Sequence, residues 1–272
     1  MKTIKIAAFF ILSIMLTGKL FAQQQITVPL SDPGKSYKLE MHLLDGSIKI
    51  VGYEGKDIVI DVETDSAKSH RNDDGGSGTG MRRINGGNGL DLTATENSNT
   101  VSITSGFAKR NATVVVKVPQ TTADFKVTTV NNGNINISNV SGTLEVINVN
   151  GSIACTNIAG SVVANTVNGE VKVTFKSIDA KAAMAFTTLN GNVDVTLPAD
   201  AKENLKLKSE RGEIYSDFDM AIDKTQPKTQ ITNEDHMHRI TIEDWVYGKI
   251  NGGGPEMLMK NMQGNIYVRK AK

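Results

Sequence analysis

The feature that most constrains this chain is a glycine that recurs every nine residues through its middle. Apolar residues stand two and four positions after each glycine, so both side chains would lie on one face of an extended strand. A third apolar residue stands seven positions after the first four glycines, and we expect it to point inward after a bend. The repeat consists of Gly133, Gly142, Gly151, Gly160 and Gly169; then Ile135, Leu144, Ile153, Val162 and Val171; Ile137, Val146, Cys155, Ala164 and Val173; and Val140, Val149, Ile158 and Val167.

A strand this short cannot bury its own apolar face, so neighbouring units have to stack into a continuous core. Asn132, Asn150 and Asn168 precede alternate glycines at intervals of 18 residues, which indicates that two units form one coil. We therefore expect a ladder of stacked asparagine amides, with Asn-Gly corners where both residue types tolerate positive φ. The predicted interior columns are Ile135, Ile153 and Val171 in one, and Leu144 and Val162 in the other.

The repeat continues in a looser form on both sides of this segment. Glycines followed by alternating apolar residues stand at Gly46, Gly191, Gly212 and Gly264. Alternating or β-branched runs between them predict further strands, and no segment after residue 22 has a sustained helical period. These runs are 56–64, 90–95, 100–104 and 112–118.

Two segments depart from the pattern. Residues 65–89 contain seven glycines with few apolar side chains, a composition that predicts a mobile surface loop. Residues 220–233, around Pro227, are expected to carry the chain from the stacked coils to the closing strands. The predicted domains are therefore a leader at 1–22 and a β-solenoid at 23–272 with a loop at 65–89.

The first 22 residues have the order of a secretory signal peptide. Lys2 and Lys5 precede the apolar run Ile6 to Leu16, and a small residue, Ala22, stands at the expected cleavage position. The run is shorter than the roughly 20 residues of a membrane-spanning helix, and no second apolar run of that length follows. We expect an exported chain that is periplasmic, on the cell surface or extracellular, with no transmembrane segment after cleavage.

Charge and cysteine content exclude several function classes. Cleavage would remove three lysines and no acids, so the 30 basic residues fall to 27 against 29 acidic ones. That balance gives no electrostatic footprint for nucleic acid. Cys155 is the only cysteine, which excludes an internal disulfide or a cysteine-based zinc site. We expect it to be a small buried apolar residue.

The sequence resembles the bacterial "putative adhesin" family of β-strand-repeat proteins, a domain of unknown function. The resemblance rests on the segments 44–52, 80–84, 250–256 and 263–266 together with the Asn-Gly pairs, and it spans most of the chain after residue 22. It implies a right-handed β-helix-like solenoid in the cell envelope or outside the cell. The family supplies no catalytic residues.

Two kinds of chemistry known on such folds are disfavoured by the residues. Calcium-binding β-rolls need recurrent aspartates at their turns, and the units here have none. Glycan lyases and hydrolases need clustered carboxylates on an outer face, whereas Glu145, Glu170 and Lys172 are isolated charges. We therefore predict no catalytic, cofactor-binding or metal-binding residues and no cofactor.

Two local features leave alternatives open. His236 and His238 lie two residues apart and could bind a metal, but two ligands do not make a site, and exposed strand residues are the simpler interpretation. Trp245 either covers the open end of the solenoid or stacks, with Tyr247, on a ligand. The capping role is the favoured interpretation, because terminal coils expose apolar edges that must be covered.

The function predicted from these observations is that of a non-enzymatic, adhesin-like interaction protein of the cell envelope or surface. Its partner is a protein or glycan of unknown identity, and self-association is also open. The alternatives are a glycan-active β-helix enzyme and an accessory protein of envelope stress. The outward Asn, Ser and Thr side chains favour broad, weak, repeated hydrogen bonding over a tight pocket.

Overall fold

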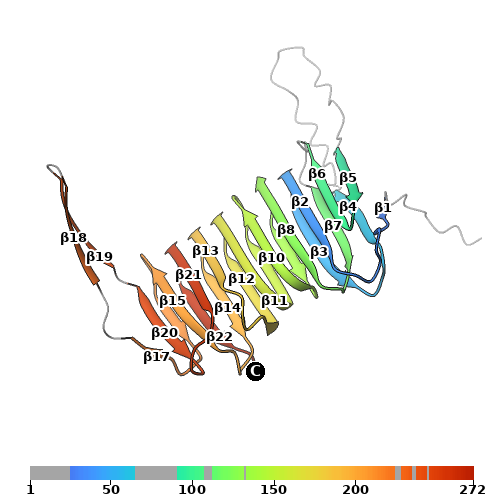
Figure 1. The fold of residues 1–272 in the computed structure, drawn as a ribbon. Helices are drawn as coiled ribbons and strands as arrows, with labels where there is room; N and C mark the ends of the chain where they lie inside the picture. The colour runs from blue at the N-terminus through green and yellow to red at the C-terminus, as the bar shows by residue number, and fades with distance from the viewer. Residues whose placement is uncertain are drawn as a thin grey trace, which may run out of the picture.

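The computed structural model describes residues 25–64, 91–106, 112–131, 133–223, 228–234, 237–243 and 245–272. In these residues all regular structure is β (Figure 1). Hydrogen bonds join 20 of the described strands into a single sheet. This sheet turns a corner within β11 (Ile153–Asn168), whose first and second halves pair with different neighbours. The chain thus forms two strand layers, called here sheet 1 and sheet 2.

Sheet 1 is parallel through its centre and antiparallel at both edges. In spatial order it contains β5 (Leu92–Asn97), β6 (Thr100–Ser105), β2 (Tyr37–Asp45), β8 (Ala123–Asn131), β10 (Ser141–Asn148), the second half of β11, β13 (Met184–Asn190), β21 (Glu256–Gln263), β15 (Glu203–Ser209), β20 (Val246–Ile250) and β17 (Ala221–Ile222).

Sheet 2 is also parallel through its centre, but it has antiparallel strands at only one edge. In spatial order it contains β1 (Gln25–Val28), β4 (Ile58–Thr64), β7 (Ala112–Pro119), β3 (Ser47–Tyr53), β9 (Ile135–Ser138), the first half of β11, β12 (Val171–Ile178), β14 (Val193–Leu197), β22 (Ile266–Lys270) and β16 (Ile214–Ser216). A separate hairpin of β18 (Lys228–Glu234) and β19 (Met237–Glu243) projects from one end of the stack (Figure 1).

The predicted interior columns are confirmed. Ile153 lies in register between Ile135 and Val171 in sheet 2, and Leu144 lies beside Val162 in sheet 1. All five side chains are fully buried. They belong to one continuous hydrophobic cluster between the two sheets, as expected when short strands can bury apolar area only by stacking.

The prediction that the residue seven positions after each glycine points inward is wrong for two of the four residues. Seven residues after the glycine, Val140 and Ile158 are buried, but Val167 is 38% exposed and Val149 is only partly buried. The corner that leads to Val140 and Ile158 contains a left-handed asparagine, which turns the chain inward. In the described part of sheet 1, no left-handed asparagine precedes Val149 or Val167. Side chains therefore alternate strictly along the strand, and these two valines point outward. The left-handed residues are Asn139 and Asn157, both with φ of 57°.

The coils do not stack in the order of the sequence. The coil made by β2 and β3 lies between β6–β7 and β8–β9. At the other end, the coil made by β21 and β22 lies between β13–β14 and β15–β16. The first and the last coils of the chain are therefore each inserted one place in from an end of the stack.

Glycines form a column at one corner of the stack, in the same inserted order. A Cβ atom built on Gly151 would lie 2.0 Å from the Gly133 carbonyl oxygen, and the φ of Gly264 is +115°. Neither the spacing nor the dihedral angle suits a larger residue. The column runs Gly46, Gly133, Gly151, Gly169, Gly191, Gly264 and Gly212.

Three of these glycines, Gly151, Gly169 and Gly191, are preceded by asparagines that are hydrogen-bonded to one another along the stack. The side-chain amide of Asn168 donates to the Asn150 side-chain oxygen at 2.9 Å, and Asn190 donates to Asn168 at 2.8 Å. Asn132 and the segment 65–89, for which a mobile loop is predicted, lie outside the described residues, as does the predicted leader.

Candidate functional site

The charged residues considered for catalysis are not brought together. Glu145 lies on the outer face of sheet 1 and forms an ion pair with Lys126 at 3.6 Å, and both side chains are about half exposed. Lys172 is exposed on sheet 2, and Glu170 lies at the corner before it. An ion pair of this kind contributes little to stability and offers no shared reaction centre.

The thiol and imidazole groups offer little chemistry. Cys155 is fully buried, and burial raises the pKa of its thiol to about 12, so it remains a protonated, apolar residue. His236, and the side chain of His238, lie outside what the structure describes. Among the described side chains, no group of three His, Cys, Asp or Glu is placed to hold a metal ion.

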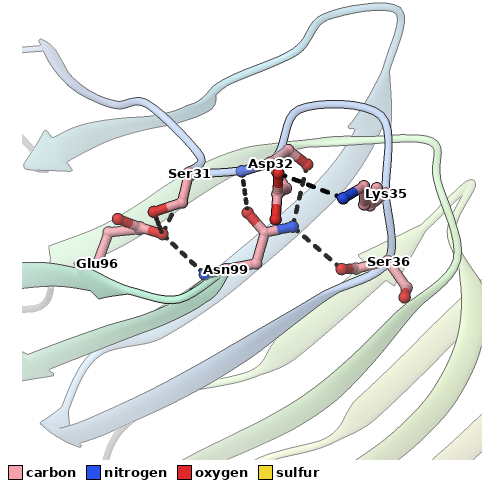
Figure 2. Close-up of polar contacts among 6 residues, drawn as sticks. All are labelled: Ser31, Asp32, Lys35, Ser36, Glu96 and Asn99. Carbon is pink, nitrogen blue, oxygen red and sulfur yellow. Dashed lines mark hydrogen bonds and ion pairs between the residues drawn. The ribbon is translucent and has the colours of Figure 1, made fainter.

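A polar network fixes the segment between β1 and β2 to the β5–β6 hairpin (Figure 2). The Asn99 side-chain oxygen accepts from the Asp32 backbone N–H at 2.8 Å, and its amide donates to the carbonyls of Asp32 and Ser36 at 3.0 and 3.1 Å. One Glu96 oxygen accepts from the Ser31 hydroxyl and backbone N–H and from the Asn99 N–H. These bonds lower the pKa of Glu96, and the network's role is structural.

A second polar column lies inside the stack, and the sequence analysis missed it. Side-chain donors from sheet 1 reach the carbonyls of the corner glycines, as when Thr166 donates to Gly151 at 2.8 Å. The signal available in the sequence was a polar residue three positions before five of the corner glycines, namely Gly151, Gly169, Gly191, Gly212 and Gly264. The donor–acceptor pairs are Thr129–Gly46, Asn148–Gly133, Thr166–Gly151, Thr188–Gly169, Asn261–Gly191 and Ser209–Gly264.

The outer face of sheet 1 carries a row of exposed apolar side chains, which we call the apolar row. Because the strands are parallel and in register, one side chain from each strand continues the row. With strands about 4.8 Å apart, it extends about 24 Å from its first to its last member. Its members are Leu44, Val130, Val149, Val167, Leu189 and Met262.

An open groove of about 670 Å³ lies at the C-terminal end of the apolar row. Leu189 and Met262 supply apolar surface, and Thr187 supplies a hydroxyl. Arg211 and Lys260 bring positive charge to its wall, with Glu210 as the acidic residue that lines it. The groove therefore combines apolar, hydroxyl and cationic groups on one face.

Beside the groove, three lysines surround the indole ring of Trp245. The Lys206 ammonium lies 4.8 Å from the ring centroid, and those of Lys208 and Lys260 lie 5.8 and 5.9 Å from it. All three lysines come from the outer face of β15 and β21, so Trp245 lies over that face and not over the open end of the stack. We call Lys206, Lys208, Lys260 and Trp245 the lysine cluster.

Sheet 2 carries a second aromatic group near the same end of the stack. Tyr215 and Tyr267 stack with their ring centroids 5.3 Å apart, and Tyr215 is 51% exposed. The Arg269 guanidinium lies 4.8 Å from the Tyr267 ring and donates to Asp194 at 2.8 Å, which raises the pKa of Arg269. The arginine is thus already paired.

One ionisable side chain lies in the core without a polar partner. Glu203 is fully buried at the start of β15. Neither of its carboxylate oxygens has a hydrogen-bond partner among the described residues. Desolvation raises its pKa to about 7, because burial disfavours the charged form.

Comparisons with known proteins found two solved bacterial structures that are similar to this chain. A putative cell adhesion protein from Clostridium sporogenes is 10% identical, with a TM-score of 0.41 over 92% of this chain and 100% of its own. A putative adhesin from Bacteroides fragilis is 13% identical, with a TM-score of 0.40 over 90% of this chain and 95% of its own. No curated protein matches the sequence.

The stretch from early β8 to the end of β19 matches a protein-family model. The model is that of Toastrack DUF4097, a domain of unknown function with a β-solenoid-like fold, and it matches residues 124–244. In the described part of the chain, no helix has the length and apolar character needed to cross a membrane. Over residues 124–244 the chain is therefore similar to the Toastrack DUF4097 family.

Proposed function

We propose that this chain is a non-enzymatic, adhesin-like interaction protein of the bacterial cell envelope or surface, which binds an extended macromolecule through the outer face of sheet 1. The observation that carries the proposal is the apolar row, which leaves four large apolar side chains about 40% exposed in one line. A continuous apolar patch on a solvent-exposed face commonly marks a site of interaction with another molecule.

The surroundings of the row also favour an extended partner. Thr128, Ile147, Asn165 and Thr187 form the neighbouring row on the same face. Hydroxyl and amide groups beside an apolar strip suit a partner that is held by many weak contacts along its length. The groove at the end of the row is open and does not enclose a small molecule.

The arrangement of acidic residues supports a non-enzymatic role. A glycoside hydrolase needs two carboxyl groups held within about 10 Å of each other across the scissile bond. Glu145 is paired with Lys126 on sheet 1, whereas Asp194 is paired with Arg269 on sheet 2. Glu40, which lies across Lys126 from Glu145 on the same face, is itself paired with Lys38 at 2.6 Å, so each of these carboxylates is held in an ion pair.

We also propose that residues 1–22 are a signal peptide that is removed on export. Cleavage after Ala22 would release residues 23–272 outside the cytoplasm, where they would fold as one solenoid that winds in the right-handed sense with Asn-Gly corners. N-terminal sequencing of the protein recovered from its native cell would test the cleavage. Recovery of an intact Met1 would contradict it.

Binding of the purified chain to isolated cell envelopes tests the contact surface. Replacing Val167 and Leu189 by glutamate would place two charges in the apolar row, and we expect at least tenfold weaker binding. Thr156→Glu on the outer face of sheet 2 is the matched control and should bind normally. Circular dichroism would establish that each variant is folded.

Two results would overturn the proposal. One is a folded V167E/L189E variant that binds envelopes as tightly as the unchanged chain. The other is turnover of any glycan in a substrate screen. Turnover abolished by Glu145→Gln would restore the enzyme alternative at the position considered from the sequence.

A further inference from the structure

We propose that the groove and the lysine cluster bind a segment of an acidic, uronate-containing polysaccharide. The inference rests on the proposed function, because it names the chemical class of partner that the C-terminal end of the same face would take. Positive charge, an aromatic ring and apolar surface converge there.

The groove and the lysine cluster bring several positive charges together. Lys206, Lys208 and Lys260 have their ammonium groups within 6 Å of one ring centroid, and Arg211 lines the groove beside Lys260. Of these lysines, Lys208 pairs with Glu210 at 3.1 Å. Among the described side chains of the groove and the lysine cluster, four cations stand against one carboxylate, Glu210, although the chain as a whole is nearly neutral. Such a patch lowers the free energy of a bound polyanion, and the effect weakens with salt.

The lysines of the cluster are spaced regularly along and between adjacent strands. Lys260 and Lys208 lie opposite each other on adjacent strands, which are about 4.8 Å apart. Lys206 lies two residues before Lys208 on the same strand, a separation of about 6.8 Å. Cations at these separations match charges that recur once per sugar unit along a polymer better than a single small anion.

Aromatic, apolar and hydroxyl groups lie next to the lysines. Trp245 and Tyr247 both lie beside Lys206, and aromatic rings offer the apolar faces of sugars a flat contact surface. Leu189 and Met262 extend the apolar surface into the groove, and Thr187 adds a hydroxyl. A polymer with both carboxylates and sugar rings uses all of these groups, whereas a simple polyphosphate would use the cations alone.

Trp245 is the only tryptophan in the chain, so its fluorescence reports on this site alone. We expect polygalacturonate to change the Trp245 emission and neutral dextran to leave it unchanged. We also expect iodide to quench the emission more strongly than caesium, because the lysines concentrate anions at the ring. Raising the salt from 50 to 500 mM should weaken polygalacturonate binding at least fivefold.

Variants separate a specific site from general attraction. Lys206→Gln with Lys260→Gln should weaken polygalacturonate binding at least tenfold, and Lys206→Arg with Lys260→Arg should largely retain it. Lys49→Gln with Lys172→Gln removes two exposed charges from sheet 2 and should leave binding unchanged. Binding measured by biolayer interferometry gives a readout that does not depend on the fluorophore.

Several outcomes would overturn the inference. These are no polygalacturonate binding, equal binding by K206Q/K260Q, equal binding by the neutral dextran, or binding of dextran sulfate or a single-stranded oligonucleotide as tight as that of polygalacturonate. If K206Q/K260Q still binds envelopes through the apolar row but the chain ignores polygalacturonate, the inference fails and the proposed function stands. Leu44→Glu with Val130→Glu changes the apolar row at the end away from the groove, and loss of envelope binding in that variant with normal polygalacturonate binding supports both.

Discussion

The side-chain amide of Asn261 donates a hydrogen bond of 3.0 Å to the carbonyl oxygen of Gly191, a residue 70 positions earlier in the chain. This contact exists because β21 is inserted between β13 and β15. The same column of bonds joins Thr166 to Gly151 and Thr188 to Gly169, where the coils follow one another directly. The inserted coil therefore reproduces the corner geometry of the sequential ones.

Removal of this bond gives the first prediction. Asn261 is fully buried, so Asn261→Ala leaves the Gly191 carbonyl without that donor and should lower the free energy of unfolding by about 2 kcal/mol. Asn261→Thr should recover much of the loss, because Thr166 and Thr188 make the equivalent bond. Chemical denaturation measures both. Asn136→Ala, at an exposed position, is the control, and equal destabilisation by it would contradict the prediction.

The second prediction concerns the glycine column. A methyl group on Gly151 would collide with the Gly133 backbone at 2.0 Å, and backbone in a packed stack cannot easily move away. We expect Gly151→Ala to lower the free energy of unfolding by about 3 kcal/mol or more. Gly106→Ala is the matched control, since nothing lies within 4 Å of the added atom. A thermal melt in which the two variants behave alike would sink the prediction.

The polar network of Figure 2 gives the third prediction. Asn99 has a φ of 62°, so Asn99→Gly preserves the backbone conformation while it removes three side-chain hydrogen bonds. We expect a loss of about 2 kcal/mol or more and faster amide hydrogen exchange in residues 31–36. Asn97→Ala, at an exposed neighbouring position, should change neither. Unchanged exchange in N99G would show that the segment is held by other contacts.

The fourth prediction is a pH dependence caused by Glu203. Its pKa is raised from 4.5 to about 7 in the folded chain, so the folded state holds the proton more tightly than the unfolded state. Stability from this group is complete below about pH 4.5 and is lost as the pH rises through about 7. At about 1.4 kcal/mol per pH unit between the two pKa values, the total is roughly 3 to 4 kcal/mol.

Glu203→Gln tests this dependence. The variant should be more stable than the unchanged chain by roughly 3 to 4 kcal/mol at pH 8.5, and the difference should vanish near pH 4. Glu213→Gln, at an exposed position, should show no such trend. A difference that does not vary with pH would mean that Glu203 is not the titrating group.

Sequence alone determined which side chains face the core in the central coils. The glycine spacing and the i, i+2 pattern identified Ile135, Ile153 and Val171 as one column, because alternation along a strand is a local property. It also predicted an all-β chain and the strands near 56–64 and 112–118. The same local argument failed at Val149 and Val167, where the outcome depends on whether the preceding corner contains a left-handed residue.

Only the tertiary structure decided which coils are neighbours. Any parallel strand can offer the same backbone hydrogen bonds to any other, so the repeat does not specify that β21 lies beside β13 or that β2 lies beside β6. Trp245 illustrates the consequence. Its sequence context favoured an end cap over a ligand-contacting residue, and that prediction is wrong because the ring lies over the outer face of sheet 1. The inserted position of β21 is what brings Lys260 next to Lys206 and Lys208 at the ring. The lysine cluster is therefore a product of long-range packing, which no local pattern in the chain encodes.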